Sequence, residues 1–206
     1  MRVLLLGASG RAGGEVLGCL LLSGADVTSF GRTAPKRPGA RHVAGAIDDA
    51  DALAAAMDGR DAVLSCLAST NSEPVCSRAA AAVIAAAGGR PVRFLSIGGA
   101  GVDAPGDRKG VPDRLVGLIM RVPVGRMLAD RQAELAMLER SALDWTMLRP
   151  PRLTEGAPKG AWAFSFERPP SFAIDRADLA GAMVEAIGRP DLRRRAPFVA
   201  APKGSA

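Results

Sequence analysis

The sequence predicts an α/β fold in which a doubly wound parallel sheet is covered by helices on both faces. Two observations predict it: short apolar runs alternate with helical stretches, and several of these runs are almost continuously apolar. Parallel strands that are buried on both faces read in this way. Repeated β-α-β units with one helix per crossover favour the strand order 3-2-1-4-5-6. At 206 residues and 48% hydrophobic composition, the chain is expected to form one domain over residues 1–206.

The expected elements follow this alternation from the first residues onward. The predicted strands are Arg2–Leu6, Asp26–Phe30, Arg41–Ala44, Asp61–Leu67, Val92–Ile97, Leu143–Leu148 and Pro197–Ala201. The predicted helices are Ala12–Leu22, Asp49–Met57, Ser77–Ala87, Asp130–Ser141 and Arg176–Ile187. Asp48 is expected to cap the second helix and Asp175 the last, because aspartate accepts hydrogen bonds from first-turn N–H groups.

Two segments, at about 99–128 and 150–173, interrupt the alternation and are expected to form a small substrate-side extension. The apolar part of the first, "LVGLIMRVPV", is expected to fold over the C-terminal edge of the sheet. In the second, "WAFSF" places Trp162, Phe164 and Phe166 on one face of a short strand. Both ordinary core packing and the wall of a substrate pocket are compatible with this pattern.

The charge and the cysteines limit the function classes. The net charge of +6 is spread along the chain, and its densest cluster, Arg193–Arg195, has no interleaved aromatic residues, so nucleic-acid binding is not expected. A basic surface that attracts anionic small molecules fits better. No signal peptide or membrane-length apolar run is visible, which predicts a cytoplasmic protein without membrane insertion. Cys19, Cys66 and Cys76 form no CxxC pair, and His42 has no evident partners, so free thiols and no metal site are expected.

The stretch "LLLGASGRAGGEVL" is the strongest functional signal. An apolar strand ends in three glycines at Gly7, Gly10 and Gly13, and a helix follows. Such a loop permits a tight turn, a close approach of backbone to a pyrophosphate, and close packing of helix on strand, while the helix N-terminus favours the anion. The motif opens the first β-α-β unit, which is the context that supports dinucleotide binding. Contacts to the cofactor are also expected from Ser9, Arg11 and Ala12.

The second strand indicates which dinucleotide is bound. It ends at Arg32, nineteen residues after Gly13, where NAD-specific folds place an acidic residue that binds the ribose hydroxyls. Arg32 and Thr33 are therefore predicted to bind the 2′-phosphate, so that NADP(H) is preferred over NAD(H). The alternative is that Arg32 is a solvated surface arginine.

Several segments together resemble the atypical short-chain dehydrogenase/reductase superfamily. They are "GASGRAG", "DAVLSCLAST", "VRFLSIGGAGV", "LERSALDWTMLRPPRL" and "IDRADLAGAMVEAI". The fourth is similar to a segment of the NmrA-like group that includes biliverdin reductase B and flavin reductases. The resemblance implies a Rossmann-type fold and further contacts to the cofactor from Ile47, Leu67, Ala68, Ser96 and Pro150. Ala46 stands where the group usually has an acidic residue.

The sequence departs from the main superfamily in one decisive respect. It contains no tyrosine, so the Ser-Tyr-Lys chemistry with tyrosine as general acid is impossible. The resemblance leaves Ser96, Arg131 and Arg152 as candidate catalytic residues. Arginine stays protonated, so the two arginines are suited to hold a phosphate or a carboxylate rather than to exchange protons.

Two functions fit these features. The first is an NADPH-dependent reductase that transfers hydride to a flavin, a quinone or a similar planar acceptor, since such a product takes its proton from water. Its acceptor would contact Arg152, Trp162 and Phe164. The second is a non-enzymatic NADP(H)-binding sensor of NmrA-like type that signals through a protein partner.

Overall fold

The computed structural model describes residues 1–69, 73–108 and 111–202, with side chains outside 111–124. Its centre is a six-stranded sheet with the order β3-β2-β1-β4-β5-β6, and every neighbouring pair is parallel. The strands are β1 (Arg2–Leu6), β2 (Asp26–Gly31), β3 (Arg41–Ala44), β4 (Ala62–Ser65), β5 (Arg93–Ile97) and β6 (Asp144–Leu148). The predicted fold class and strand order are confirmed.

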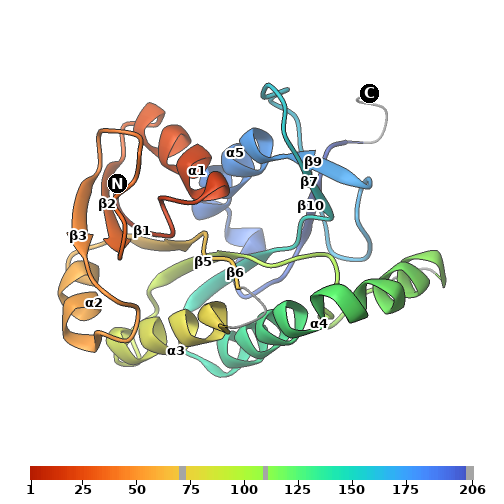
Figure 1. Cartoon of the computed structure of the whole chain (residues 1–206), viewed down its shortest axis with the longest axis horizontal. Helices are drawn as coiled ribbons and strands as arrows, with labels where there is room; N and C mark the ends of the chain where they lie inside the picture. The colour runs from red at the N-terminus through yellow and green to blue at the C-terminus, as the bar shows by residue number, and fades with distance from the viewer. Residues whose placement is uncertain (70–72, 109–110, 203–206) are drawn as a thin grey trace.

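Helices cover both faces of this sheet, as Figure 1 shows. They are α1 (Arg11–Leu22), α2 (Ala50–Met57), α3 (Val75–Ala87), α4 (Val111–Arg140) and α5 (Arg176–Ile187). α1 and α5 lie side by side on one face, and α2, α3 and α4 lie on the other. Among the described residues, no helix has the length and apolar character needed to cross a membrane.

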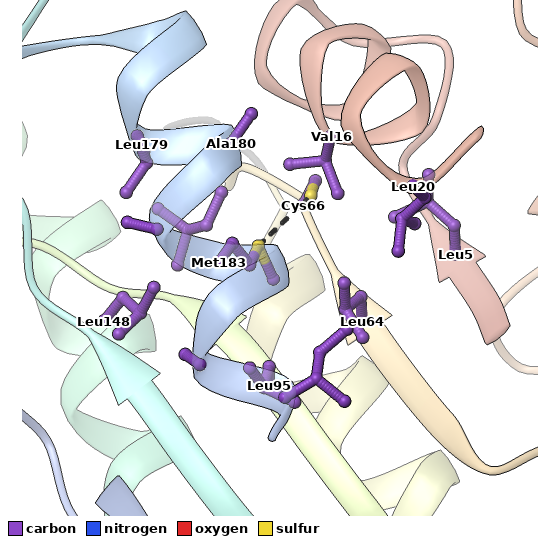
Figure 2. Close-up of a cluster of buried hydrophobic side chains, with 14 of the residues drawn as sticks. Leu5, Val16, Leu20, Leu64, Cys66, Leu95, Leu148, Leu179, Ala180 and Met183 are labelled. Atoms are coloured by element: carbon purple, nitrogen blue, oxygen red, sulfur yellow. Dashed lines mark hydrogen bonds between the residues drawn. The ribbon is translucent and has the colours of Figure 1, made fainter. Parts of the chain in front are cut away.

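Each face of the sheet has its own apolar core because strand side chains alternate between the two faces. Figure 2 shows the core under α1 and α5, where Val16 and Leu20 meet Leu179, Ala180 and Met183 over the strands. The Cys66 thiol lies 3.9 Å from the sulfur of Met183 in this core. All three cysteines are free, as predicted, and Cys19 is half-buried.

The helix predicted at Asp130–Ser141 is much longer in the structure. α4 begins at Val111, so the stretch "LVGLIMRVPV" is helical rather than part of an irregular connection. α4 contains prolines at positions 112 and 123, although proline usually breaks a helix. Proline is tolerated in the first turn, where its missing N–H has no helical partner, and this accounts for Pro112.

The two predicted caps are corrected. Asp49, not Asp48, caps α2 and accepts a hydrogen bond from the N–H of Ala52 at 3.0 Å. Asp48 instead pairs with Arg78 on the neighbouring helix α3. Asp175 stands at the first boundary of α5, but its side chain does not cap the helix.

The C-terminal extension consists of two small sheets. β7 (Arg152–Thr154) pairs in parallel with β9 (Ala173–Asp175). β8 (Ala163–Ser165) pairs antiparallel with β10 (Phe198–Ala200). The predicted strand at Pro197–Ala201 therefore exists but does not join the main sheet as a full strand; isolated bridges link Arg195 to Thr146 of β6 and Phe198 to Arg149 just after it.

Candidate functional site

The glycine loop after β1 has the geometry that its sequence predicts. Gly7 has a φ of +78°, and a Cβ there would lie 2.9 Å from the carbonyl carbon of Cys66. A Cβ on Gly13 would lie 2.0 Å from the carbonyl oxygen of Gly7, so only glycine lets the first turn of α1 pack on the loop. These two glycines hold the loop against the end of β4, and Gly10 forms the boundary of the helix.

The N-terminus of α1 is open to an anion. Gly10 is its N-cap and no side chain caps the helix. Ser9, Gly10 and Arg11 are exposed, whereas Ala12 is half-buried. The first-turn N–H groups of a helix have no helical partner and carry partial positive charge, so this end suits a phosphate.

The basic residues after β2 lie at the same edge of the sheet. Leu6, the last residue of β1, pairs in register with Phe30, and Arg32 and Thr33 follow two and three residues later. Both side chains are exposed. Because the C-terminal ends of parallel strands meet at one edge, Arg32 and the glycine loop face the same region. Arg37 packs instead over Gly18 on α1.

The ends of β4, β5 and β6 continue this edge. Leu67 is half-buried and Ala68 exposed directly after β4. Pro150, after β6, is buried, and its carbonyl accepts the N–H of Ala100 at 2.9 Å. Ile47, half-buried, packs against the core beneath α2 and α3. The structure thus brings the predicted cofactor residues to a single edge; their contacts to a cofactor stay a prediction.

Arg131 is tied to this edge from α4. Its guanidinium donates to Glu134 at 2.8 Å and to the carbonyl of Leu67. Glu134 is fully buried, and burial raises its pKa, although the charge of Arg131 opposes that shift. Arg131 therefore links α4 to the end of β4, and Glu134 fixes its orientation.

Ser96 lies beneath the edge rather than at its surface. Ser96 is fully buried. It lies on the same sheet face as Phe94, which packs under α3 and α4. Its hydroxyl lies near Glu134 and favours the charged carboxylate, although neither Ser96 Oγ nor Glu134 Oε1 has a hydrogen-bond partner of normal geometry in the described structure. This burial favours a supporting role for Ser96, and its contact with an acceptor stays a prediction.

A second buried carboxylate, Asp130, holds the start of α3. Its oxygens accept the N–H groups of Cys76 at 2.9 Å and Ser77 at 3.1 Å. The hydroxyls of Ser69 and Ser77 also donate to it. Burial alone would raise the pKa of Asp130, but these hydrogen bonds outweigh it and lower the pKa. Asp130 thus caps α3 from α4 and fixes the connection that follows β4.

We expect Asp130→Asn to lower the free energy of unfolding by about 2 kcal/mol at pH 7, since hydrogen bonds to a charged group are lost. Because the folded pKa lies below the unfolded value of about 3.9, the carboxylate's contribution is present above that pH and disappears as the pH falls through the folded pKa. Urea unfolding from pH 7 to pH 3 should show the two proteins converging at low pH. Asp51→Asn, at an exposed site on α2, is the control. A difference that stays constant with pH would contradict this role.

The predicted substrate residues fall into two places. Arg152 is exposed at the start of β7, where its N–H donates to the carbonyl of Phe172. Trp162 packs on Gly181 of α5, and its indole N–H donates to Glu185 at 2.7 Å. Phe164 lies under the guanidinium of Arg189, with 5.5 Å to the ring centre.

These contacts of the two aromatic residues favour packing on α5, and their contact with an acceptor stays a prediction. The described residues contain no group of three or more histidine, cysteine or acidic side chains that could hold a metal ion. The His42 ring instead hydrogen-bonds to Ser29 at 2.9 Å.

Sequence reasoning missed Asp130, Glu134 and Glu155. The first two stand four residues apart in a segment predicted as helix, so their shared face was visible in the sequence. Their partners on β5, on α3 and in the connection before α3 were not. Glu155 contacts Arg11 across 144 positions of sequence, and no local pattern signals such a contact.

The sequence matches a known family over residues 7–190, from the first glycine of the loop to the end of α5 and beyond. The chain belongs to the NAD(P)H-binding family. This confirms the recognition of a nucleotide-binding domain. No curated protein sequence matches the chain.

Solved structures share the whole fold. ChuY from Escherichia coli O157:H7, an anaerobilin reductase, superposes with a TM-score of 0.81 at 21% identity over 100% of both chains. SP1627 from Streptococcus pneumoniae, named as a candidate NADH-flavin reductase, gives 0.80 at 19% identity over 98% of this chain and 99% of that one. A short-chain dehydrogenase/reductase from Veillonella parvula in complex with NADP gives 0.78 at 17% identity, covering 100% of this chain and 96% of the other. At these identities the likeness establishes the fold.

Proposed function

We propose that this NAD(P)H-binding protein is an NADPH-dependent oxidoreductase that passes hydride to a flavin, a quinone or a similar planar acceptor. The observation that carries the proposal is the combination of an open phosphate-binding edge with a chain that contains no tyrosine. A ketone reductase of the main superfamily needs that tyrosine as a general acid. A flavin or quinone takes up its proton from water after the hydride arrives, so the residues need only bind, orient and exclude water.

The residues divide this work by position. The glycine loop and the first turn of α1 would hold the pyrophosphate, and Arg32 with Thr33 would hold the 2′-phosphate. Leu67 and Ala68 would border the nicotinamide end. A bound NADPH supplies the hydride. Arg131, which Glu134 and the Leu67 carbonyl orient, would lie beside that end.

The names of two solved neighbours support this reaction class: one is described as an anaerobilin reductase and the other as a candidate NADH-flavin reductase. A flavin is an extended conjugated molecule. Arg152, exposed on β7, is the residue that would bind an anionic tail of such an acceptor. Assignment to the NmrA-like group remains part of this proposal.

The test is NADPH oxidation, followed by absorbance at 340 nm, with FMN, FAD, biliverdin-like tetrapyrroles and a series of quinones. We expect turnover with at least one planar acceptor and none with simple ketones or aldehydes. Tight NADPH binding without turnover on any acceptor would replace the proposal by the non-enzymatic sensor, which needs the same cofactor site and a protein partner. Turnover of a simple ketone would also contradict it.

A further inference from the structure

Glu155 lies where the N-termini of two helices meet. Its Oε1 accepts a hydrogen bond from Nη1 of Arg11 at 3.2 Å and another from Nη1 of Arg176. Arg11 is the first residue of α1 and Arg176 the first of α5, and these helices lie side by side (Figure 1). One carboxylate from the C-terminal extension therefore bridges the glycine loop and α5.

The two arginines differ in how firmly they are held. The side chain of Arg11 is 78% exposed, whereas that of Arg176 is only 14% exposed. Glu155 itself is largely exposed. Its bond to Arg11 is thus a solvated ion pair that exchanges partners easily, and its bond to Arg176 anchors the carboxylate at the other side.

Arg11 belongs to the loop that is suited to hold the cofactor's phosphates. Carboxylate and phosphate oxygens make the same kind of charge-assisted bond to a guanidinium. Any phosphate that reaches Arg11 must therefore compete with Glu155, which is already in place.

We propose that Glu155 sets the affinity for the dinucleotide: it serves as an internal anion on Arg11, and the cofactor's phosphates displace it. This inference rests on the proposed NADPH-dependent function. The cost of displacing Glu155 weakens binding, and the freed carboxylate stays attached to Arg176. The same exchange detaches the segment after β7 from the glycine loop when the cofactor binds.

The test is titration of NADPH against the wild type and Glu155→Gln, followed by the fluorescence of the reduced nicotinamide. An exposed ion pair of this kind is worth up to about fivefold in an equilibrium constant, so the Kd should fall about two- to fivefold in the variant. Glu167→Gln is the matched control. Glu167 is an exposed carboxylate of the same extension that pairs with Arg108 instead of the glycine loop. The Kd of the Glu167→Gln variant for NADPH should not change. An equal fall in Kd in both variants would show a general charge effect and overturn the inference.

A double-mutant cycle separates the contact from other effects of Glu155. In an Arg11→Gln background, Glu155→Gln should no longer change the Kd, because the guanidinium for which Glu155 and the phosphate compete is gone. If Glu155→Gln still lowers the Kd for NADPH in the Arg11→Gln background, the inference is overturned. Wild-type protein that binds neither NADPH nor NADH would overturn the proposed function together with it. If the wild type binds NADPH and the Glu155→Gln variant binds it with the same Kd, this inference alone is overturned.

Discussion

Replacing Arg32 with aspartate is expected to abolish most of a preference for NADPH over NADH. Arg32 is exposed directly after Gly31, the last residue of β2, at the sheet edge where the glycine loop also lies. A charge-assisted contact to a phosphate is worth roughly 1.5–3 kcal/mol, which is about ten- to a hundredfold in affinity. Wild-type protein should bind NADPH at least about tenfold more tightly than NADH. In Arg32→Asp the new carboxylate repels the 2′-phosphate but leaves NADH binding nearly unchanged.

Titration of both cofactors against both proteins measures this difference. Arg140→Asp is the matched control, since it makes the same charge change at an exposed arginine at the far end of α4. It should keep the NADPH preference. The preference should also shrink as salt rises, because screening weakens contacts between exposed charges. Equal affinities in the wild type, or an Arg32→Asp protein that still prefers NADPH, would show that Arg32 is an ordinary surface residue.

The sheet could be predicted because its signals are local. Each central strand is an apolar run, and buried runs between helices leave few alternatives for their order. The errors occurred where local signals conflict with packing. Cys66 and Leu67 continue an apolar run, but β4 ends at Ser65, and the chain turns there toward the glycine loop. α4 passes through Pro123, a residue that predicts a break from local sequence alone.

Local sequence signals point only to the cofactor side of the candidate site. The glycine spacing and Arg32 belong to a pattern that lies within a single β-α-β unit, so the local sequence is sufficient to predict a dinucleotide site there. The roles of the buried carboxylates of α4 depend on partners that lie far away in the sequence. Glu134 lies beside Ser96, and Asp130 binds the start of α3; neither contact has a local signature. For the aromatic strand, the sequence left core packing and a pocket wall both open; the hydrogen bond of Trp162 to Glu185 on α5 favours packing, and contact with an acceptor stays a prediction.

Arg149 is the clearest example of a motif residue whose role only the fold reveals. It is the arginine of "LRPP", and its side chain is 1% exposed. Two of its nitrogens bind the two carboxylate oxygens of Asp107, each at 2.7 Å. It also donates to the carbonyls of Val102 and Ala196, and its guanidinium lies 3.8 Å from the ring centre of Phe198.

These contacts join three parts of the chain at the end of β6. Val102 and Asp107 belong to the connection after β5, while Ala196 and Phe198 belong to the C-terminal segment. A buried charge with all its partners in place adds little net stability, but one that loses a partner is costly. Arg149 therefore fixes the position of the 99–108 segment relative to the sheet.

Arg149→Met is expected to lower the free energy of unfolding by about 3–5 kcal/mol, because it removes the cationic partner of the Asp107 carboxylate and a donor to the carbonyls of Val102 and Ala196. Urea denaturation measures the change. Asp48→Asn, which breaks an exposed pair with Arg78, is the control and should cost less than about 1 kcal/mol. The double variant Arg149→Met/Asp107→Leu should recover part of the loss, since no unpaired charge remains. If Arg149→Met costs no more than the control, or the double variant loses the sum of two single effects, the buried pair does not organise this end of the sheet.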